Sequence, residues 1–542
     1  MGPSAVRIAG LAERLKAAPA PRAALVAQLR PSEIPLSYAQ RRLWFLDRLE
    51  GDGAGFGSAT YTIPLAVRLC GALDRAALAG ALSDVVGRHE SLRTVFPERL
   101  GVPRQEIVPA SAVAVELVVE AVSEAALSEA LTACAGRGFD LSRELPLRAH
   151  LYALSADEHV LLLVLHHIAG DGWSLGPLWR DLAGFYRGRR LGVSASLPAL
   201  PVQYADYTLW QRAVLGEESE AGSALSEQLS YWRSALAELP EQIDLPFDRS
   251  RPAVSSHRGG SVPVVLDGSL HGALLRLSRD GGASLFMVLQ AGVAALLSRL
   301  GAGPDIALGS PIAGRGEAAL EQLVGLFVNT LVLRTDVSGN PGFAELLGRV
   351  RAGNLAAYSH QDLPFERLVE VLNPQRSLSR HPLFQVMLAF QSQGLPALEL
   401  AGLSVRPEPV LTASAKFDLS VSLSEHRAAG GAALGIDGVL EYASDLFDRG
   451  SVALLGQRLV RLLAAAAADP GRAIGGLEIL SGAERAQLLA GWNATARPVA
   501  AQSLPELFAA QALRTPAAGA LVCGERRVGC AGLAAHAHPL AH

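Results

Sequence analysis

The sequence has little that indicates a metal, a disulfide framework, a membrane or a nucleic acid. Its four cysteines have neither metal-ligand spacing nor a disulfide pattern: Cys70, Cys134, Cys523 and Cys530. We expect no stretch to approach the roughly eighteen apolar residues of a membrane span, and the N-terminus lacks a signal-peptide pattern. A formal net charge of −4 gives no reason to expect nucleic acid. These features predict a cytoplasmic protein with no metal, membrane or nucleic-acid partner.

The stretch from His159 to Ser174 contains the most informative pattern in the 542 residues. Residues 160–165 are uninterrupted branched apolar side chains, which is typical of a strand buried on both faces. The run leads directly into His166 and His167. Because successive strand residues point to opposite faces, only one of the two histidines can face a given cavity. We therefore predict one functional histidine and one supporting histidine.

The spacing changes after Gly172 and predicts a helix. Gly170 and Gly172 allow a sharp turn that brings Asp171 beside the histidines, where a carboxylate can orient an imidazole or pair with an arginine. Ser174 is the predicted N-cap of the helix. Its apolar side chains follow at helical spacing: Leu175, Leu178, Trp179, Leu182 and Phe185.

The pattern His-His-x-x-x-Asp-Gly resembles the signature of nonribosomal peptide synthetase condensation domains, members of the chloramphenicol-acetyltransferase-like superfamily. Other stretches resemble the same family in the expected order, including 34–46, 88–96, 204–212 and 379–386. The resemblance spans residues 34 to 480. The flanking stretches resemble the type that joins an L-donor to an L-acceptor.

The resemblance implies a layered α/β fold, in which two chloramphenicol-acetyltransferase-like lobes form a V-shaped pseudo-dimer around a central tunnel. We expect the N-terminal lobe over 34–203 and the C-terminal lobe over 204–480. Residues 1–33 would combine a remnant of a carrier domain's last helix, over 5–17, with a linker marked by Pro19, Pro21 and Pro31.

Residues 481–542 resemble a linker and the degenerate start of an adenylation domain. Pro539 lies where a regular amphipathic helix is expected and would break it. The sequence therefore predicts a truncated or frameshifted synthetase, or a fragment of one.

The resemblance implies amide-bond formation between two thioesters. The amine of an acceptor aminoacyl group on a downstream carrier domain attacks the donor thioester on an upstream carrier domain. Both substrates hang on phosphopantetheine arms, and an adenylation domain is the further partner. No cofactor is expected to be bound by this chain.

The resemblance also implies roles for the residues of the signature. His167 is the predicted central residue, which accepts a proton from the attacking amine or holds it in line with the carbonyl. His166 supports the loop, and Asp171 holds its geometry through an arginine. Gly172 permits close approach of the substrate or provides a backbone donor to the oxyanion.

Several other residues are expected to support the site. An arginine can bind a loop carboxylate bidentately, and Asp171 is such a carboxylate. Arg315 is the preferred partner, ahead of Arg88. A strand is predicted from Gly325 to Arg334, and Asn329 interrupts its apolar run and therefore needs partners or a function. The predicted supporting residues are Arg315, Arg88, Arg93, Asn329, Trp173 and Ser310.

Three alternatives remain open from the sequence, and a fourth is disfavoured. An epimerisation domain shares the signature, and a free-standing acyltransferase with a coenzyme A donor is also possible. A heterocyclisation domain is less favoured because paired aspartates replace its histidines. Finally, the chain could be a catalytically idle docking or recruitment module left by a broken synthetase.

Overall fold

The computed structural model describes residues 23–50, 59–220, 222–375, 377–392, 399–410, 414–428, 430–499 and 501–540. The helix predicted over 5–17 and the prolines at 19 and 21 lie outside the described residues. The chain divides into two compact units, 1–479 and 480–542, and each is described by itself.

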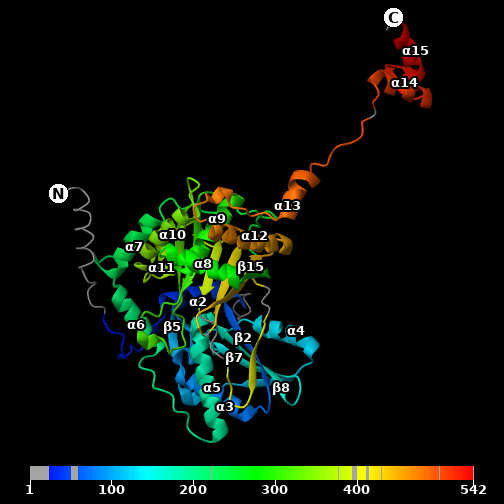
Figure 1. Cartoon of the computed structure of the whole chain (residues 1–542). Coiled ribbons are helices and arrows are strands. Elements are labelled where there is room, and N and C mark those ends of the chain that lie inside the picture. Colours follow the sequence, from blue (N-terminus) through cyan, green and yellow to red (C-terminus); the bar gives the residue numbers. More distant parts are fainter. Residues whose placement is uncertain are drawn as a thin grey trace, which may run out of the picture. The chain divides into compact units, whose positions relative to one another are not determined.

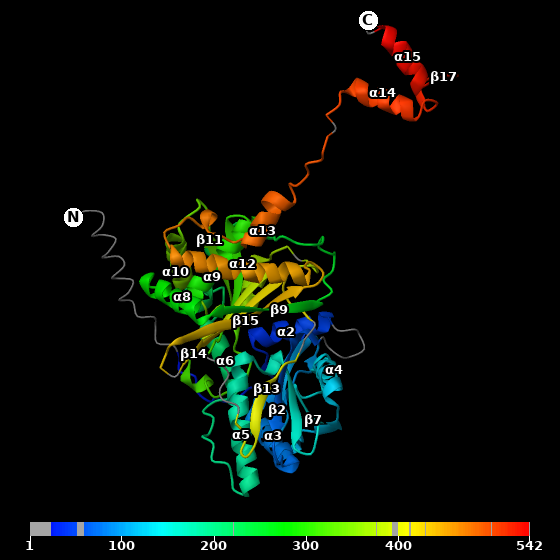
Figure 2. The same cartoon turned by 45° about the vertical axis from the view of Figure 1, so that its right-hand side comes forward.

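A five-stranded sheet forms the core of the first lobe, with strand order β13-β2-β8-β7-β6. The predicted strand is β8, Glu158–His166, and all of its residues after Glu158 are buried. Helices α3 and α5 pack side by side (Figures 1 and 2). The elements up to residue 235 include β1 (Ile34–Pro35), α2 (Tyr38–Glu50), β2 (Thr62–Cys70), α3 (Arg75–Arg88), β3 (Thr94–Val95), β4 (Glu98–Arg99), β5 (Val102–Ile107), β6 (Leu117–Ala121), α4 (Glu124–Ala135), β7 (Leu147–Ala153), β8, α5 (Leu175–Leu191), α6 (Tyr204–Leu215) and α7 (Ala224–Ala235).

A six-stranded sheet forms the core of the second lobe, with strand order β11-β10-β12-β14-β15-β9. Helices α8, α9, α10 and α12 lie together over this sheet (Figures 1 and 2). The mixed α/β architecture agrees with the predicted fold class. The elements between residues 236 and 479 include β9 (Gly259–Asp267), α8 (Gly268–Asp280), α9 (Leu285–Leu297), β10 (Asp305–Ile312), β11 (Asn329–Asp336), α10 (Phe343–Tyr358), α11 (Phe365–Leu372), β12 (Val386–Gln391), β13 (Ser404–Glu408), β14 (Leu419–Arg427), β15 (Ala433–Ala443) and α12 (Arg449–Ala468).

One strand of the first sheet comes from the second half of the chain. Strand β13 pairs antiparallel with β2, so the boundary predicted at residue 203 does not separate the two sheets. Arg68 on β2 is buried and binds Glu408 on β13 at 2.7 Å. The same guanidinium binds Glu124 and Glu158, which ties the crossing strand to its neighbours. The first lobe is therefore completed by a later segment.

The strand predicted from Gly325 begins later, at Asn329. Residues 325–328 remain in a loop because the backbone N–H groups of Gly325, Phe327 and Val328 bond to Ser174 and Asp171 of the first lobe. A backbone donor engaged in this way is not available to a sheet ladder.

The N-terminal segment that the structure describes, 23–33, packs against α6. Trp210 donates to the Ala23 carbonyl at 2.6 Å. Arg30 binds Asp206 at 3.1 Å and Glu90 at 2.6 Å. This part of the predicted linker is thus fixed to the first unit.

Among the residues that the structure describes, two helical stretches are long and apolar enough to cross a membrane, so the expectation that none approaches this length is wrong. They are Leu285–Ala302 and Arg449–Ala468, and the apolar windows are 72% and 39% buried. α9 packs against α10 and α12, and α12 packs against β9. Their composition is explained by packing inside the lobe, as for the core helix of a globular protein.

The second unit contains α13 (Gly482–Ala486), α14 (Leu504–Arg514), the hairpin β16 (Gly519–Cys523) and β17 (Arg526–Gly529), and α15 (Cys530–Leu540). The prediction that Pro539 breaks this last helix is wrong, because α15 continues through it. Pro539 lies one residue before the helix end, where the loss of its N–H affects only the final turn.

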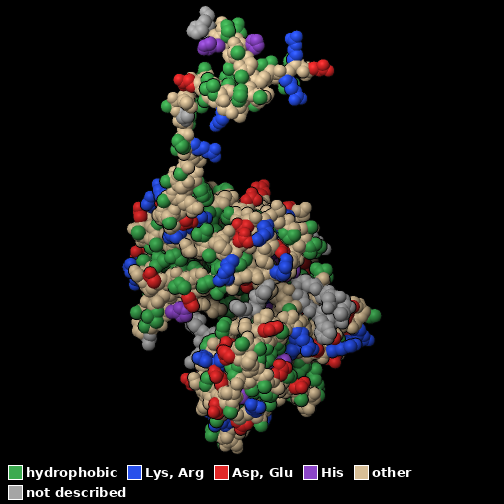
Figure 3. Space-filling view, turned by 90° about the vertical axis from the view of Figure 1, so that its right-hand side faces the viewer, with side chains coloured by type: hydrophobic (Ala, Val, Ile, Leu, Met, Phe, Trp, Pro, Cys, Tyr) green, Lys and Arg blue, Asp and Glu red, His purple; other side chains and the backbone are tan. Residues whose placement is uncertain are grey.

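Positive and negative side chains are interspersed on the face shown in Figure 3, without a large area of one sign. This distribution matches the small net charge of the chain.

His381 forms a contact between the second half of the chain and helix α2. Its Nε2 accepts a hydrogen bond from Arg42 on α2 at 3.1 Å, and its Nδ1 donates to the Pro382 carbonyl at 2.9 Å. Burial lowers the pKa of His381 to about 3. A histidine in the unfolded chain has a pKa of about 6.5, so near and below that pH the unfolded state binds more protons than the folded state.

We predict that His381 makes the protein less stable in mild acid, by about 2 kcal/mol at pH 5 relative to pH 7. His381→Gln should lose correspondingly less unfolding free energy over this range in urea titrations. His426→Gln, which changes a ring with 49% exposure, is the matched control. The same pH dependence in all three proteins would contradict the prediction.

Candidate active site

The two histidines lie where β8 ends and a 3₁₀ helix, His167–Ala169, begins. His166 caps this turn, since its Nδ1 accepts a hydrogen bond from the Ile168 N–H at 3.1 Å. Its ring is fully buried, stands edge-on to Phe139, and places Nε2 3.6 Å from Asp47 Oδ1. Burial lowers the pKa of His166. The ring is therefore neutral and is occupied in holding the turn.

His167 is half-buried, and its backbone carbonyl accepts a hydrogen bond from Gly170. Burial lowers the pKa of His167 well below its ordinary value, and the positive charge of Lys416 acts in the same direction. A neutral imidazole accepts a hydrogen bond, but a strongly lowered pKa makes it a weak general base. This environment favours orientation of a reacting group over proton abstraction.

Asp171 does not bond to either histidine among the hydrogen bonds of the described residues; instead it connects the two lobes. Its side chain is 1% exposed. Oδ2 accepts the backbone N–H groups of Phe327 at 2.8 Å and Val328 at 3.1 Å. Oδ1 accepts the Ser174 N–H at 2.9 Å and lies 3.3 Å from Arg315 Nη2. These donors replace the hydrogen bonds to water that the carboxylate loses on burial.

Ser174 has a different role from the predicted one. Asp171, not Ser174, caps the 3₁₀ turn Gly172–Ser174, in a reciprocal capping box, and α5 begins at Leu175 without a side-chain cap. The Ser174 hydroxyl is needed elsewhere. It lies 2.8 Å from both Asp171 Oδ1 and the Gly325 carbonyl, and 3.0 Å from Arg315.

Arg315, rather than Arg88, is the arginine at Asp171. Its Nη1 donates to the Leu323 carbonyl at 2.9 Å and also to that of Leu320. Its guanidinium lies over the Phe327 ring, 4.4 Å from the centroid. Arg315 thus shapes the loop between β10 and β11 and attaches it to Asp171.

Arg88 and Arg93 lie at the end of α3 and have other partners. Arg88 binds Asp181 on α5 at 2.8 Å, and Arg93 donates to the Val108 carbonyl at 2.6 Å. The buried His89 between them binds the same Asp181 and accepts a hydrogen bond from the Val324 N–H. These residues brace the first lobe and its contact with the crossing loop.

Four further predicted residues are placed as follows. An added side chain at Gly172 would meet nothing within 4 Å, so this glycine borders open space. Trp173 is 42% exposed, and Ser310 is buried on β10 opposite Leu331. Asn329 finds its partners in the 361–365 segment, since it donates to the Gln361 and Leu363 carbonyls and accepts from the Phe365 N–H. Its role in the structure is to anchor that segment.

Sequence reasoning missed Asp47 and Lys416. Asp47 is a buried acid on a helix whose neighbours Arg48 and Leu49 are exposed, and no local pattern links it to a histidine more than a hundred residues away. Lys416 could have been singled out from the composition, because the chain has only two lysines, Lys16 and Lys416.

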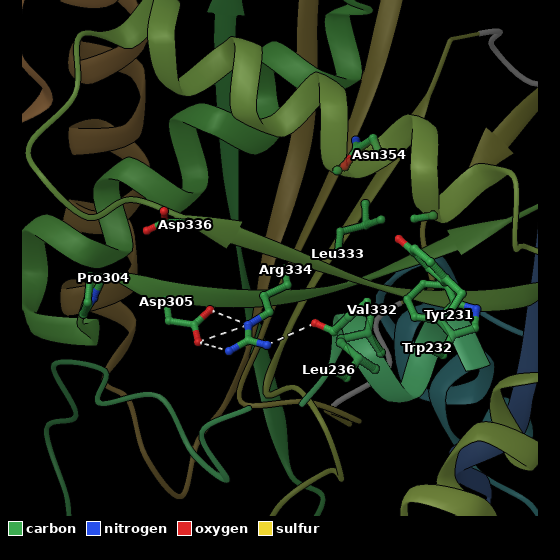
Figure 4. Close-up of a pocket in the computed structure, with 13 residues that line it drawn as sticks. Tyr231, Trp232, Leu236, Pro304, Asp305, Val332, Leu333, Arg334, Asp336 and Asn354 are labelled. Atoms are coloured by element: carbon green, nitrogen blue, oxygen red, sulfur yellow. Dashed lines mark hydrogen bonds and ion pairs between the residues drawn. The ribbon is translucent and has the colours of Figure 1, made fainter. Parts of the chain in front are cut away.

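Two cavities lie outside the histidine turn. One of about 340 Å³ borders the Arg315 loop and shares Phe327, Val328 and Asn329 with the network described above. The other, of about 470 Å³, lies within the second lobe (Figure 4). There Arg334 binds Asp305 at 2.7 Å, beside the aromatic pair Tyr231 and Trp232. Because Arg334 is already paired, this second cavity offers no evident reactive group. Among the described residues, no group of three or more His, Cys, Asp or Glu is arranged to hold a metal ion.

Comparison with known proteins gives a consistent result. The family model described as "Condensation domain" matches residues 31–489. The chain is 52% identical, over 94% of its length, to the probable non-canonical nonribosomal peptide synthetase CymA of Salinispora arenicola. It is 50% identical, over 98% of its length, to a dimodular nonribosomal peptide synthase of Bacillus subtilis. The chain spans only 6% and 22% of the lengths of these relatives.

Solved structures agree with this family match. The X-domain from teicoplanin biosynthesis is 39% identical, with a TM-score of 0.79, and the match covers 84% of this chain and 100% of that one. A four-domain nonribosomal peptide synthetase bound to AMP and glycine shares the fold, with a TM-score of 0.80 at 24% identity, over 94% of this chain and 38% of that one.

We predict that Asp171→Asn destabilises the protein by about 3–5 kcal/mol, because an amide leaves the Arg315 charge without its carboxylate and places N–H groups against backbone donors. Thermal and urea unfolding measure the change. Asp157→Asn, at an exposed loop position of the same lobe, should unfold like wild type. A normally melting Asp171→Asn protein would show that the carboxylate does not hold the loop.

Proposed function

The chain belongs to the condensation-domain family of nonribosomal peptide synthetases, and we propose that it forms an amide bond between two carrier-bound substrates. The amine of an acceptor aminoacyl thioester attacks the carbonyl of a donor thioester. A C–N bond forms, the C–S bond of the donor breaks, and the donor thiol leaves with a proton equivalent to the one lost by the amine.

One observation carries this proposal within the family match. A neutral, half-buried His167 lies at the end of a rigid core strand, and Gly172 borders open space in the same loop. His166 and Asp171 are instead occupied by the fold, through Asp47 and through the second-lobe loop. His167 is therefore the member of the signature that is available to a substrate.

The acceptor chemistry matches a weakly basic histidine. An α-amino group has a pKa of roughly 7.7–8.0, so an appreciable fraction is already neutral at physiological pH. Positioning of the reactants lowers an activation barrier by roughly 7–11 kcal/mol, whereas a general base raises the rate by roughly 10²–10⁴-fold. His167 accepts a hydrogen bond from the amine and holds it in line with the carbonyl, and the Gly172 backbone is the candidate donor to the oxyanion.

The partners follow from this chemistry. The donor arrives on an upstream carrier domain and the acceptor on a downstream one, each on a phosphopantetheine arm, with an adenylation domain loading the amino acid. An L-donor, an L-acceptor, a cytoplasmic location and the lack of a bound cofactor are parts of the same proposal that rest on the sequence alone.

We predict that this chain transfers a donor group onto a loaded acceptor carrier and that His167→Ala lowers the single-turnover rate by at least about 10²-fold, because the amine loses its orienting group. Intact-protein mass spectrometry of both carriers measures the product. His150→Ala, which changes a half-buried histidine on the neighbouring strand β7, is the matched control and should retain transfer.

Two outcomes would contradict the proposal. Unchanged transfer by His167→Ala would remove this residue from the mechanism. No transfer by the folded wild-type protein, across several loaded donor and acceptor pairs, would favour a docking module in place of an enzyme.

A further inference from the structure

Lysine is almost absent from this chain. Only two of its 48 lysine and arginine residues are lysine, and only Lys416 lies in the part of the chain that the structure describes. Arginine occupies the other basic positions that form ion pairs among the described residues. Lys416 is therefore a distinctive residue, and its location is informative.

Lys416 belongs to the second lobe, three residues before β14 begins at Leu419. The backbone there is fixed, because Ala415 is buried and its N–H donates to the His257 carbonyl at 2.8 Å. The Lys416 side chain is half-buried, and its ammonium lies 5.1 Å from the centroid of the Tyr61 ring in the first lobe. The lysine thus bridges the two lobes.

Tyr61 shows where on the first lobe this ammonium lies. It directly precedes Thr62, which is the register partner of His166 in the β2–β8 ladder. The ammonium is therefore held at the end of the strand that delivers the histidines. In agreement with this placement, the charge of Lys416 follows burial as the next cause of the lowered pKa of His167.

The other charged groups around this pair are few in the described residues. His167 faces Lys416 and His166, while His166 faces Asp47 and, more weakly, Lys416 and Arg148. Lys416 faces Glu441 on β15, and burial raises the pKa of that carboxyl. No carboxylate among the groups that act on His167 offsets the lysine.

We propose that Lys416 is a positioning residue for His167: its ammonium, held against the Tyr61 ring at the end of β8, completes the active site from the second lobe and acts together with burial to favour an imidazole that accepts a hydrogen bond from the acceptor amine. This inference rests on the function proposed above. The ammonium acts through its positive charge and its location at the end of β8, where the Tyr61 ring lies against it.

The test is a titration of His167 by NMR in the full chain labelled with [¹³C]histidine, where the His167→Ala protein assigns the resonance. Lys416→Met should raise the pKa of His167 by about one pH unit, because a nearby like charge is removed. Lys416→Arg should retain most of the wild-type value. Arg406→Met, which removes a charge that is 62% exposed on β13, should leave the titration unchanged.

A second readout links the titration to the reaction. The acidic limb of the single-turnover rate should move to higher pH in Lys416→Met by the same amount, with the same acceptor so that its amine contributes equally. A merely structural lysine would change the melting temperature without moving this limb.

Two results would overturn the inference: an unchanged His167 titration in a normally melting Lys416→Met protein, or a shift of equal size in Arg406→Met. Lys416→Gln is measured in parallel, so that a polar replacement decides the question if methionine disturbs the interface. The titration needs no substrate. A wild-type protein that transfers nothing would therefore refute the proposed function, while the titration still decides the role of Lys416.

Discussion

The arrangement of this site depends on one buried carboxylate. Asp171 lies on the first lobe, yet two of its donors are backbone N–H groups of the second-lobe loop, and a third is Arg315. An ionised carboxylate at 1% exposure is stable only when such donors replace water. Those donors exist only while the loop is docked. The histidine turn and the association of the lobes are therefore parts of one interaction.

This dependence explains several features that look unrelated along the chain. Strand β11 begins at Asn329 because the four residues before it are occupied by the first lobe. Val324 enters the hydrophobic core of the first lobe, where Ser91 and His89 hold its backbone. Strand β13 crosses to the first sheet and is held there by Arg68. Each of these contacts places a segment from the second half of the chain on the first lobe, so the first lobe has no complete core without it.

The sequence predicts the local features of the site well. The apolar run before His166 specifies β8, and helical spacing specifies α5, because both patterns are decided by neighbours along the chain. The Asp171–Arg315 contact follows from chemistry, since a carboxylate among glycines in an apolar setting needs a strong donor.

What the sequence does not reveal depends on partners distant in the chain. The role of Ser174 follows from the position of Gly325, and the environment of His166 from Asp47 on α2. Local propensity makes Ser174 an N-cap and Gly325 the start of a strand, and tertiary contacts override both. Pro539 is mispredicted for a local reason. Proline disrupts the interior of a helix, but Pro539 lies one residue before the end of α15.

The two lobes also contribute differently to the chemistry. The first lobe supplies a rigid strand and an imidazole, and the second supplies the loop for Asp171 and the Lys416 ammonium over Tyr61. A charge in a poorly solvated site acts over several ångströms, so the distance between the lobes determines how strongly the Lys416 charge acts on His167. Docking of the lobes and the state of the histidine are therefore physically coupled, and the coupling needs no mobile residue within the signature itself.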